Sequence, residues 1–218
     1  MKKIILAVFV FSLILNTCYA GDSTKSSYKS YRTETKVSKK SPFELNFLYT
    51  EKGFGPSVSY YFTQTQNTDY FINLAITSVS DGRELTKVDY YTGDTYIANK
   101  EHRLFTLPLS IGVKKSLFKD DIAGSIFPTL TAGVAPTLIL SNPYEEGFFT
   151  AIGHTTTSFA FGPFAGAGII FAQDKSTTTF TFDLRYYFLK VLGKEVNSLK
   201  NTPIDNVGGI QLGLGVHF

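Results

Sequence analysis

Asp183 and Arg185 are the residues of this sequence whose types and spacing most directly suggest chemistry. They lie two positions apart in the segment "TFTFDLRYYF", residues 179–188, so in an extended strand both side chains point to one face, about 7 Å apart. Such a pair can form a charge-selective constriction in a pore or an ion pair that neutralises charges removed from water. We favour the structural ion pair, and Lys114 and Glu44 are further candidates for the same cluster.

The three histidines are the candidate general bases. His154 precedes Ser158 in a polar segment, and a histidine beside a serine can activate the hydroxyl as a nucleophile. The spacing differs from a close His-x-Ser arrangement, and no acidic residue stands where it would orient the histidine. His102 and His217 have no catalytic partner by spacing either. Because phosphate-loop, zinc and calcium motifs are also lacking from the sequence, we predict a protein that is not an enzyme and holds no cofactor or metal.

The elements that must position these residues are strands, because the dominant period from Phe43 onward is two. Bulky apolar residues alternate with small or polar ones in eight segments. These are residues 43–51, 54–62, 70–77, 105–113, 126–140, 159–171, 179–188 and 210–218.

The small face of these segments decides the fold class. It is rich in Gly, Ser, Thr, Ala and Asn and poor in the Lys and Glu that cover soluble proteins. A bulky face that meets lipid and a small polar face that fills a narrow interior fit this composition. Short and long connections also alternate along the chain. We therefore predict an all-β protein, an eight-stranded antiparallel transmembrane β-barrel.

Residues 88–98, "VDYYTGDTYIA", raise an alternative because they read as a strand, a turn and a strand. One extra spanning strand would put the two chain ends on opposite sides of the membrane. The segment must therefore contribute either no spanning strand or two. We expect a hairpin outside the membrane, with ten strands as the alternative. Pro56, Pro108, Pro128 and Pro136 each remove a donor from the sheet, and we expect bulges at these sites.

The mature barrel follows two N-terminal segments. Residues 1–20 have the basic start, apolar run and small final residue of a cleavable signal peptide; Cys18 as a lipoprotein attachment site is the alternative. Residues 21–42 form a polar, basic periplasmic lead-in, and residues 43–218 form the barrel. Without Lys2 and Lys3 the basic and acidic residues nearly balance, which argues against a nucleic-acid partner.

The last nine residues, "IQLGLGVHF", carry a resemblance. Gln211, Gly213, Val216 and Phe218 match the polar, glycine, hydrophobic and terminal aromatic pattern of the outer-membrane assembly signal. With "LPLSIGVKKSLF", "FGPFAGAGIIF" and "FDLRYYF", the chain resembles the small outer-membrane β-barrel family of the OmpA/OmpX type. It looks closest to the porin-family or PorT-like barrels of Bacteroidota-like bacteria.

The resemblance implies a multi-pass barrel in the outer membrane of a Gram-negative-type cell, exported by its signal peptide and assembled by the outer-membrane insertion machinery. We expect a structural or loop-mediated interaction role, with the lumen largely filled by side chains. A narrow porin-like channel, or an accessory role in secretion or envelope biogenesis, is the alternative. The expected partners are outer-membrane lipid, the insertion machinery and a surface ligand or partner protein at the long loops.

Overall fold

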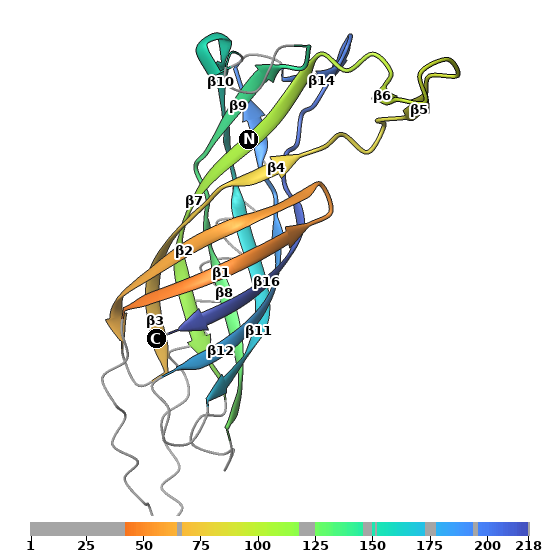
Figure 1. Cartoon of the computed structure of the whole chain (residues 1–218). Coiled ribbons are helices and arrows are strands. Elements are labelled where there is room, and N and C mark those ends of the chain that lie inside the picture. Colours follow the sequence, from red (N-terminus) through yellow and green to blue (C-terminus); the bar gives the residue numbers. More distant parts are fainter. Residues whose placement is uncertain are drawn as a thin grey trace, which may run out of the picture. The chain divides into compact units, whose positions relative to one another are not determined.

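A closed antiparallel barrel forms the body of the protein (Figure 1). The computed structural model describes residues 42–64, 67–117, 125–145, 150, 152–172, 178–193 and 196–217. The eight barrel strands follow one another in chain order, four of them interrupted once. They are β1 (Phe43–Thr50), β2 (Gly53–Gln64), β3 with β4 (Thr68–Ala75, Thr77–Val79), β7 (His102–Ser116), β8 with β9 (Ile126–Val134, Thr137–Pro143), β10 with β11 (Thr156–Phe161, Pro163–Ala172), β12 with β13 (Thr179–Tyr187, Lys190–Leu192) and β16 (Gly209–His217).

The pairing of the first and last strands closes the barrel. In the register of β1 and β16, Glu44 lies opposite His217 and Thr50 opposite Gln211. The eight-stranded prediction is therefore confirmed and the ten-stranded alternative is wrong. The signal segment 1–20, all of the lead-in except Pro42, and Phe218 lie outside the described residues.

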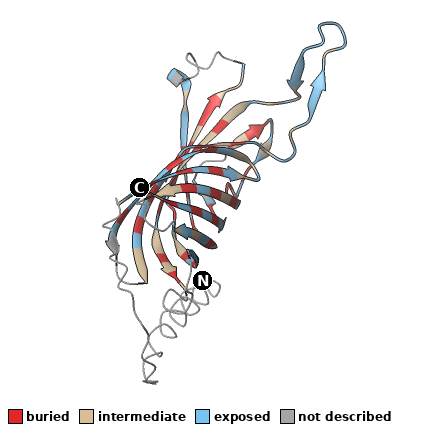
Figure 2. Ribbon diagram, turned by 60° about the horizontal axis from the view of Figure 1, so that its bottom comes forward, coloured by how far each residue is buried: buried red, intermediate tan, exposed pale blue. Residues whose placement is uncertain are grey.

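The alternation of side chains sorts the strands into an apolar outer face and a polar inner face, as predicted. In β12 every second residue from Thr179 to Tyr187 is buried, and the residues between them are exposed. Figure 2 shows buried and exposed residues alternating along the barrel strands. The exposed set includes Phe182 and Leu184, whereas Asp183 and Arg185 are buried. This is the reverse of a water-soluble barrel, where the apolar side chains would fill the interior.

The proline sites correct one expectation. Pro56, Pro108 and Pro128 lie inside continuous strands, and no residue is inserted at them. The third barrel strand is interrupted at Ile76, whose amide donates to the carbonyl of Pro56 on the neighbouring strand. On both sides of Ile76 the third strand pairs with β7 in the same register. Proline keeps an extended backbone and costs one donor, so the sheet loses a rung without a register shift. The bulge of this region is at Phe62 instead, between Tyr61 and Thr63.

The two ends of the barrel differ in their connections. β1 and β2 are joined by a two-residue turn at the loop end, where the other connections are long. These carry β5 (Thr86–Val88), β6 (Thr95–Ile97), η1 (Ile152–His154), β14 (Asn197–Leu199) and β15 (Thr202–Pro203). β5 pairs with β6 outside the barrel, so the predicted hairpin in the longest loop is confirmed. Among the described residues, no helix is long and apolar enough to cross a membrane.

The wall continues above the β1–β2 turn on one side only. There β4, β7, β9, β10 and β13 form an open sheet. Its inner face carries apolar side chains among small polar ones such as Thr77, Thr106 and Ser141, and the last long connection packs against the apolar ones. The shared core contains Val79, Leu104, Ile139, Ala160, Leu189, Val196, Ile204 and Val207. The described chain between β13 and β16, which includes β14 and β15, therefore completes the mouth of the barrel in place of further wall strands.

Candidate functional site

Three charged residues meet inside the barrel, and we call Lys114, Asp183 and Arg185 the lumen cluster. Oδ2 of Asp183 lies 3.1 Å from Nζ of Lys114 and 3.1 Å from Nη2 of Arg185. Lys114 reaches it from β7, whereas Asp183 and Arg185 are neighbours on the inner face of β12. All three residues are buried. The structure therefore brings together the predicted pair and the candidate Lys114.

Glu44 lies on the inner face of β1 with hydrogen bonds of its own. It accepts a 2.6 Å hydrogen bond from the hydroxyl of Tyr61 and a 2.8 Å bond from the hydroxyl of Thr181. The ring of Tyr61 stacks on His217 with the centroids 5.2 Å apart, which places His217 inside the barrel. Since two carboxylates and two cations occupy this part of the lumen, the formal charges of the four residues cancel.

A row of aromatic rings crosses the lumen, and the sequence analysis missed it. Successive centroid distances are 5.8 Å from Tyr61 to Phe71, 6.3 Å from Phe71 to Phe164 and 4.9 Å from Phe164 to Tyr187. The guanidinium of Arg185 lies 5.4 Å from the Phe71 centroid. The sequence did contain a signal for these rings. Phe71 and Phe164 occupy positions on the small, polar face of their segments, which the alternation directs to the interior. These rings fill the lumen beside the charges.

Glycines on the inner face make room for these side chains. A Cβ on Gly168 would touch the Asp183 carboxylate and lie 2.9 Å from the Thr129 hydroxyl. A Cβ on Gly112 or Gly133 would lie within 3.0 Å of the Phe164 ring. Contacts this short are not tolerated by real side chains, so the charges and rings need glycine opposite them.

The assembly-signal residues take defined places in β16. Gln211 is buried on the inner face opposite Thr50 and Arg185. Gly213 lies inside between Leu48 and Asp183, and Val216 pairs with Leu45 near the end of the strand. Their positions agree with the predicted alternation. Recognition by an insertion machinery stays a prediction.

The loop end holds a second cluster, which we call the loop clamp and define as Glu84, Lys100, Tyr144 and Ser198. Glu84 is 2.8 Å from Lys100 Nζ and accepts a 2.6 Å hydrogen bond from Ser198 Oγ. Lys100 Nζ lies over the Tyr144 ring, 5.4 Å from its centroid. The clamp joins three long connections that are far apart in the sequence.

The electrostatics of the loop clamp favour a charged Glu84. Burial alone would raise the pKa of the Glu84 carboxyl, but the hydrogen bonds from Lys100 and Ser198 outweigh burial and hold that pKa below its usual range. Backbone bonds support the clamp, since the amide of Glu101 donates to the Ser198 carbonyl and the amide of Tyr144 donates to the Glu101 carbonyl, each at 2.8 Å. The outer connections therefore form one linked unit.

The candidate pair His154 and Ser158 lies in two different environments. His154 is exposed in η1, whereas Ser158 is buried on the inner face of β10. Nδ1 of His102 lies 3.1 Å from the carbonyl oxygen of Asn197. Within the described part of the chain, no group of three His, Cys, Asp or Glu residues could hold a metal ion.

Comparisons with known proteins bear on the fold. No protein-family model and no curated protein matches the sequence. The structure is similar to that of Neisserial surface protein A (NspA), with a TM-score of 0.51 and 13% identity over 83% of this chain and 98% of that chain. OprG of Pseudomonas aeruginosa aligns with a TM-score of 0.47 and 9% identity, over 84% of this chain and 98% of that chain. The N-terminal β-barrel domain of OprF from the same species aligns at 0.43 and 14%, over 83% and 98%. At these identities the similarity to NspA concerns architecture alone, and it shows that this chain has the fold of the small eight-stranded outer-membrane β-barrels.

Proposed function

We propose that the protein spans the outer membrane of a Gram-negative-type cell and acts there as a closed barrel whose outer connections contact other molecules. The observation that carries this proposal is that the barrel has an apolar outer face and a charged inner face. Phe47 pairs with Leu214, and both are more than half exposed. A continuous apolar surface of this kind would aggregate in water but is stabilised by lipid.

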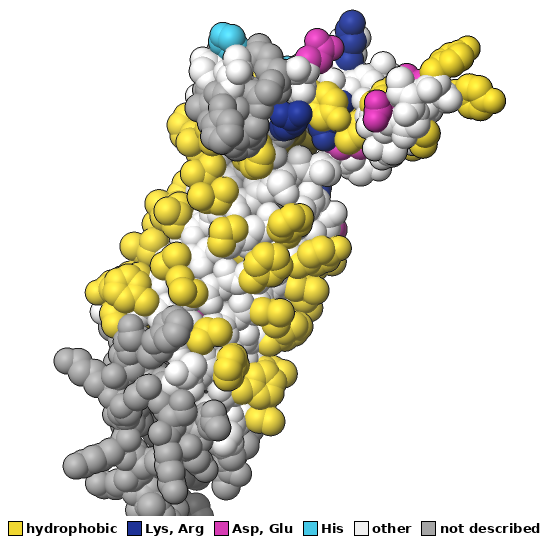
Figure 3. All heavy atoms as spheres, in the orientation of Figure 1, with side chains coloured by type: hydrophobic (Ala, Val, Ile, Leu, Met, Phe, Trp, Pro, Cys, Tyr) yellow, Lys and Arg dark blue, Asp and Glu magenta, His cyan; other side chains and the backbone are white. Residues whose placement is uncertain are grey.

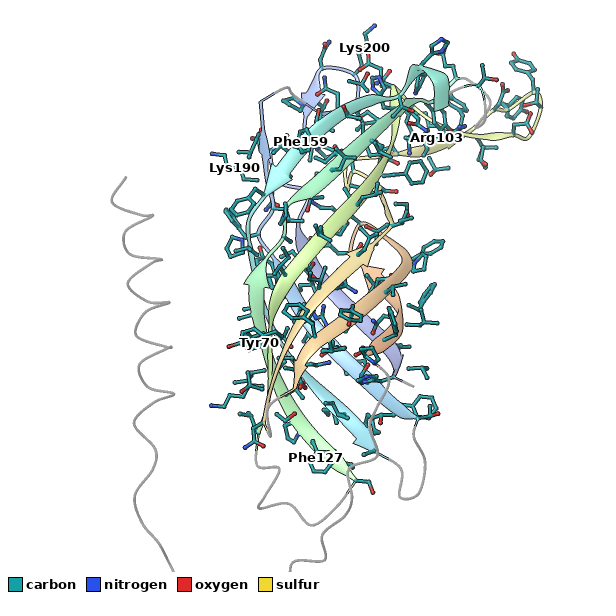
Figure 4. The ribbon with its side chains drawn as sticks, turned by 90° about the vertical axis from the view of Figure 1, so that its left-hand side faces the viewer. Tyr70, Arg103, Phe127, Phe159, Lys190 and Lys200 are labelled. Carbon is teal, nitrogen blue, oxygen red and sulfur yellow. The ribbon has the colours of Figure 1, made fainter. Side chains whose placement is uncertain are left out.

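The distribution of side-chain types along the barrel supports a membrane-spanning wall. On the face shown in Figure 3, hydrophobic side chains cover the barrel wall, and charged side chains gather at the loop end. Tyr70 lies toward the short-turn end and Phe159 toward the loop end (Figure 4). Both side chains are exposed, as expected of aromatic residues near the two interfaces of a bilayer.

The filled lumen favours a structural or interactive role over transport. The lumen cluster, the Tyr61–Tyr187 aromatic row and the Asn73 side chain, which donates to Ser57 and Ser59 at 3.0 Å each, occupy the interior. An eight-stranded barrel has little space beyond its side chains. The loop clamp then supports a defined outer surface for a surface ligand or partner protein.

Location is tested by cell fractionation and by gel mobility before and after heating. We expect the protein in the outer-membrane fraction, with a folded band that shifts on boiling. A soluble protein without such a shift would overturn the membrane assignment.

Conduction is tested in planar bilayers with the purified protein. We expect no steady openings, because the lumen cluster is buried and bridged. Steady, charge-selective openings that are lost in Arg185→Ala would replace the closed-barrel role by a narrow channel. One observation favours that second function: Asp183 Oδ1, Arg185 Nε, Thr129 Oγ1 and Thr131 Oγ1 have no hydrogen-bond partner among the described residues.

Two further parts of the proposal concern biogenesis. Residues 1–20 direct export, and the β16 pattern ending at Phe218 directs insertion; N-terminal sequencing of the mature protein tests the cleavage after Ala20. The resemblance to PorT-like barrels is what supports an accessory role in secretion or envelope biogenesis. A gene neighbourhood without secretion or envelope genes would count against that role.

A further inference from the structure

Residues 85–98, which we call the arm, project from the loop end of the barrel (Figure 1). Within the described part of the chain, its strands β5 and β6 pair only with each other. Val88 is 65% exposed, and the tip residues Tyr90 and Tyr91 are 94% and 95% exposed. An isolated two-stranded hairpin is marginally stable in water, and three or more strands are usually needed. The arm is therefore an incomplete sheet.

The base of the arm, in contrast, is firmly held. Glu84 and Lys100 of the loop clamp form their ion pair on either side of it. The amide of Lys200 donates to the Asn99 carbonyl at 2.9 Å, and Asn99 has the left-handed φ of 59° that turns the chain toward β7. The protein thus fixes the direction of the arm while it leaves the strands uncovered.

The backbone pattern shows which groups of the arm face outward. The amide of Asp89 donates to the Asp94 carbonyl at 2.8 Å, and the amide of Ala98 donates to the Leu85 carbonyl at 3.3 Å. In an antiparallel pair, hydrogen-bonded positions alternate with positions whose amide and carbonyl point away from the partner. Thr86 and Val88 therefore present these groups along one edge of the arm, and Thr95 and Ile97 present them along the other.

We propose that the β6 edge pairs with the β6 edge of a second copy of this chain, antiparallel about Tyr96. Thr95 of each copy then exchanges both backbone hydrogen bonds with Ile97 of the other, so one two-fold axis satisfies four donors and closes the contact. The result is a four-stranded sheet between two barrels. This inference goes beyond the proposed function and holds whether or not the loops bind another molecule.

The side chains select the β6 edge over the β5 edge. Pairing about Tyr96 places two tyrosines opposite each other, and cross-strand aromatic pairs are favourable. The equivalent pairing of β5 would be centred on Lys87, whose register partner in the arm is Tyr96. It would place two ammonium groups opposite each other, which is unfavourable. Because the arm extends away from the barrel wall, two barrels can meet through it (Figure 1).

Disulfide trapping in lipid vesicles tests the geometry. In a Cys18→Ser background, which removes the single cysteine of the sequence, Tyr96→Cys should form a covalent dimer at least tenfold faster than Lys87→Cys. Thr92→Cys, in the turn at the arm tip, measures random collision. Equal rates for Tyr96→Cys and either control would overturn the proposal.

A pair of proline variants tests the same contact with Tyr96 in place. Ile97→Pro and Val88→Pro each remove an outward amide that the arm itself does not use, the first from the β6 edge and the second from the β5 edge. Sedimentation in mild detergent should show a dimer for the wild type and Val88→Pro and a monomer for Ile97→Pro. A monomeric wild type, or a dimer that survives Ile97→Pro, would contradict the pairing.

Discussion

Replacement of Asp183 by Asn tests whether the lumen cluster holds the barrel together. Asn keeps the size of the side chain but removes the charge that lies 3.1 Å from both Lys114 and Arg185. Two cations are then left in a space where Lys114 is 2% and Arg185 4% exposed. Loss of one partner from a buried ion pair costs about 3–5 kcal/mol. We expect a loss of folding free energy in that range.

The folded fraction can be followed by heat-modifiable gel mobility in a urea titration in vesicles. Asp94→Asn is the matched control, because it removes the same charge from an exposed position of the longest loop and should leave the titration near that of the wild type. Lys114→Met should cost less than Asp183→Asn, since Asp183 keeps Arg185. Lys114→Met added to Asp183→Asn should restore part of the loss. If Asp183→Asn behaved like Asp94→Asn, the cluster would not stabilise the barrel and our reasoning would be refuted.

Three further predictions concern packing, insertion and pH. Gly168→Ala should destabilise the folded barrel by about 1–3 kcal/mol in the same titration, because its Cβ meets the Asp183 carboxylate and the Phe182 carbonyl; Gly82→Ala, with open space around it, should not. Leu214→Asp should lower the amount inserted into membranes, because a charged residue on the lipid face is destabilising, by about 2–4 kcal/mol for Lys or Arg at the midplane and by less for Asp. Deletion of Phe218 should lower the inserted amount as well, and unchanged insertion of both variants would contradict the assembly role of β16. Glu84 has a lowered pKa in the folded protein. Its stabilising contribution to the loop clamp is therefore complete at a pH above the ordinary carboxyl pKa of about 4.3. That contribution is lost as the pH falls through the lower pKa of the folded protein. Amide exchange at Ser198 and Lys200 should therefore show less protection in acid in the wild type, and the Glu84→Gln variant should lack this pH dependence.

The strands were predictable because the barrel repeats one local rule. Every residue of β12 follows the alternation, and the two-residue period places Asp183 and Arg185 on one face without knowledge of other strands. The hairpin at Gly93 was also predictable, because its signal is local.

Contacts between distant strands were not predictable in the same way. Lys114 meets Asp183 across 69 sequence positions, and the contact depends on the register of the two strands that lie between β7 and β12 in the sheet, β8 and β11. The loop clamp was not predictable for the same reason. Glu84, Tyr144 and Ser198 come from three connections, and no sequence motif links them. The expected bulges at the prolines were wrong. The sheet accommodates a missing amide donor by a gap in the hydrogen-bond ladder, as at Ile76, without an inserted residue.

The unequal height of the barrel wall has a consequence for the surrounding lipid. The exposed apolar residues of β1 run from Phe43 to Tyr49, whereas those of β10 and β11 run from Phe159 to Phe171. At about 3.4 Å per residue and a tilt of about 40°, these stretches cover about 16 Å and about 31 Å of membrane depth. A flat bilayer of one thickness cannot match both, so the barrel must lean or the leaflet must thin beside the β1–β2 turn. In either case the direction of the lean or of the thinning is fixed relative to the arm.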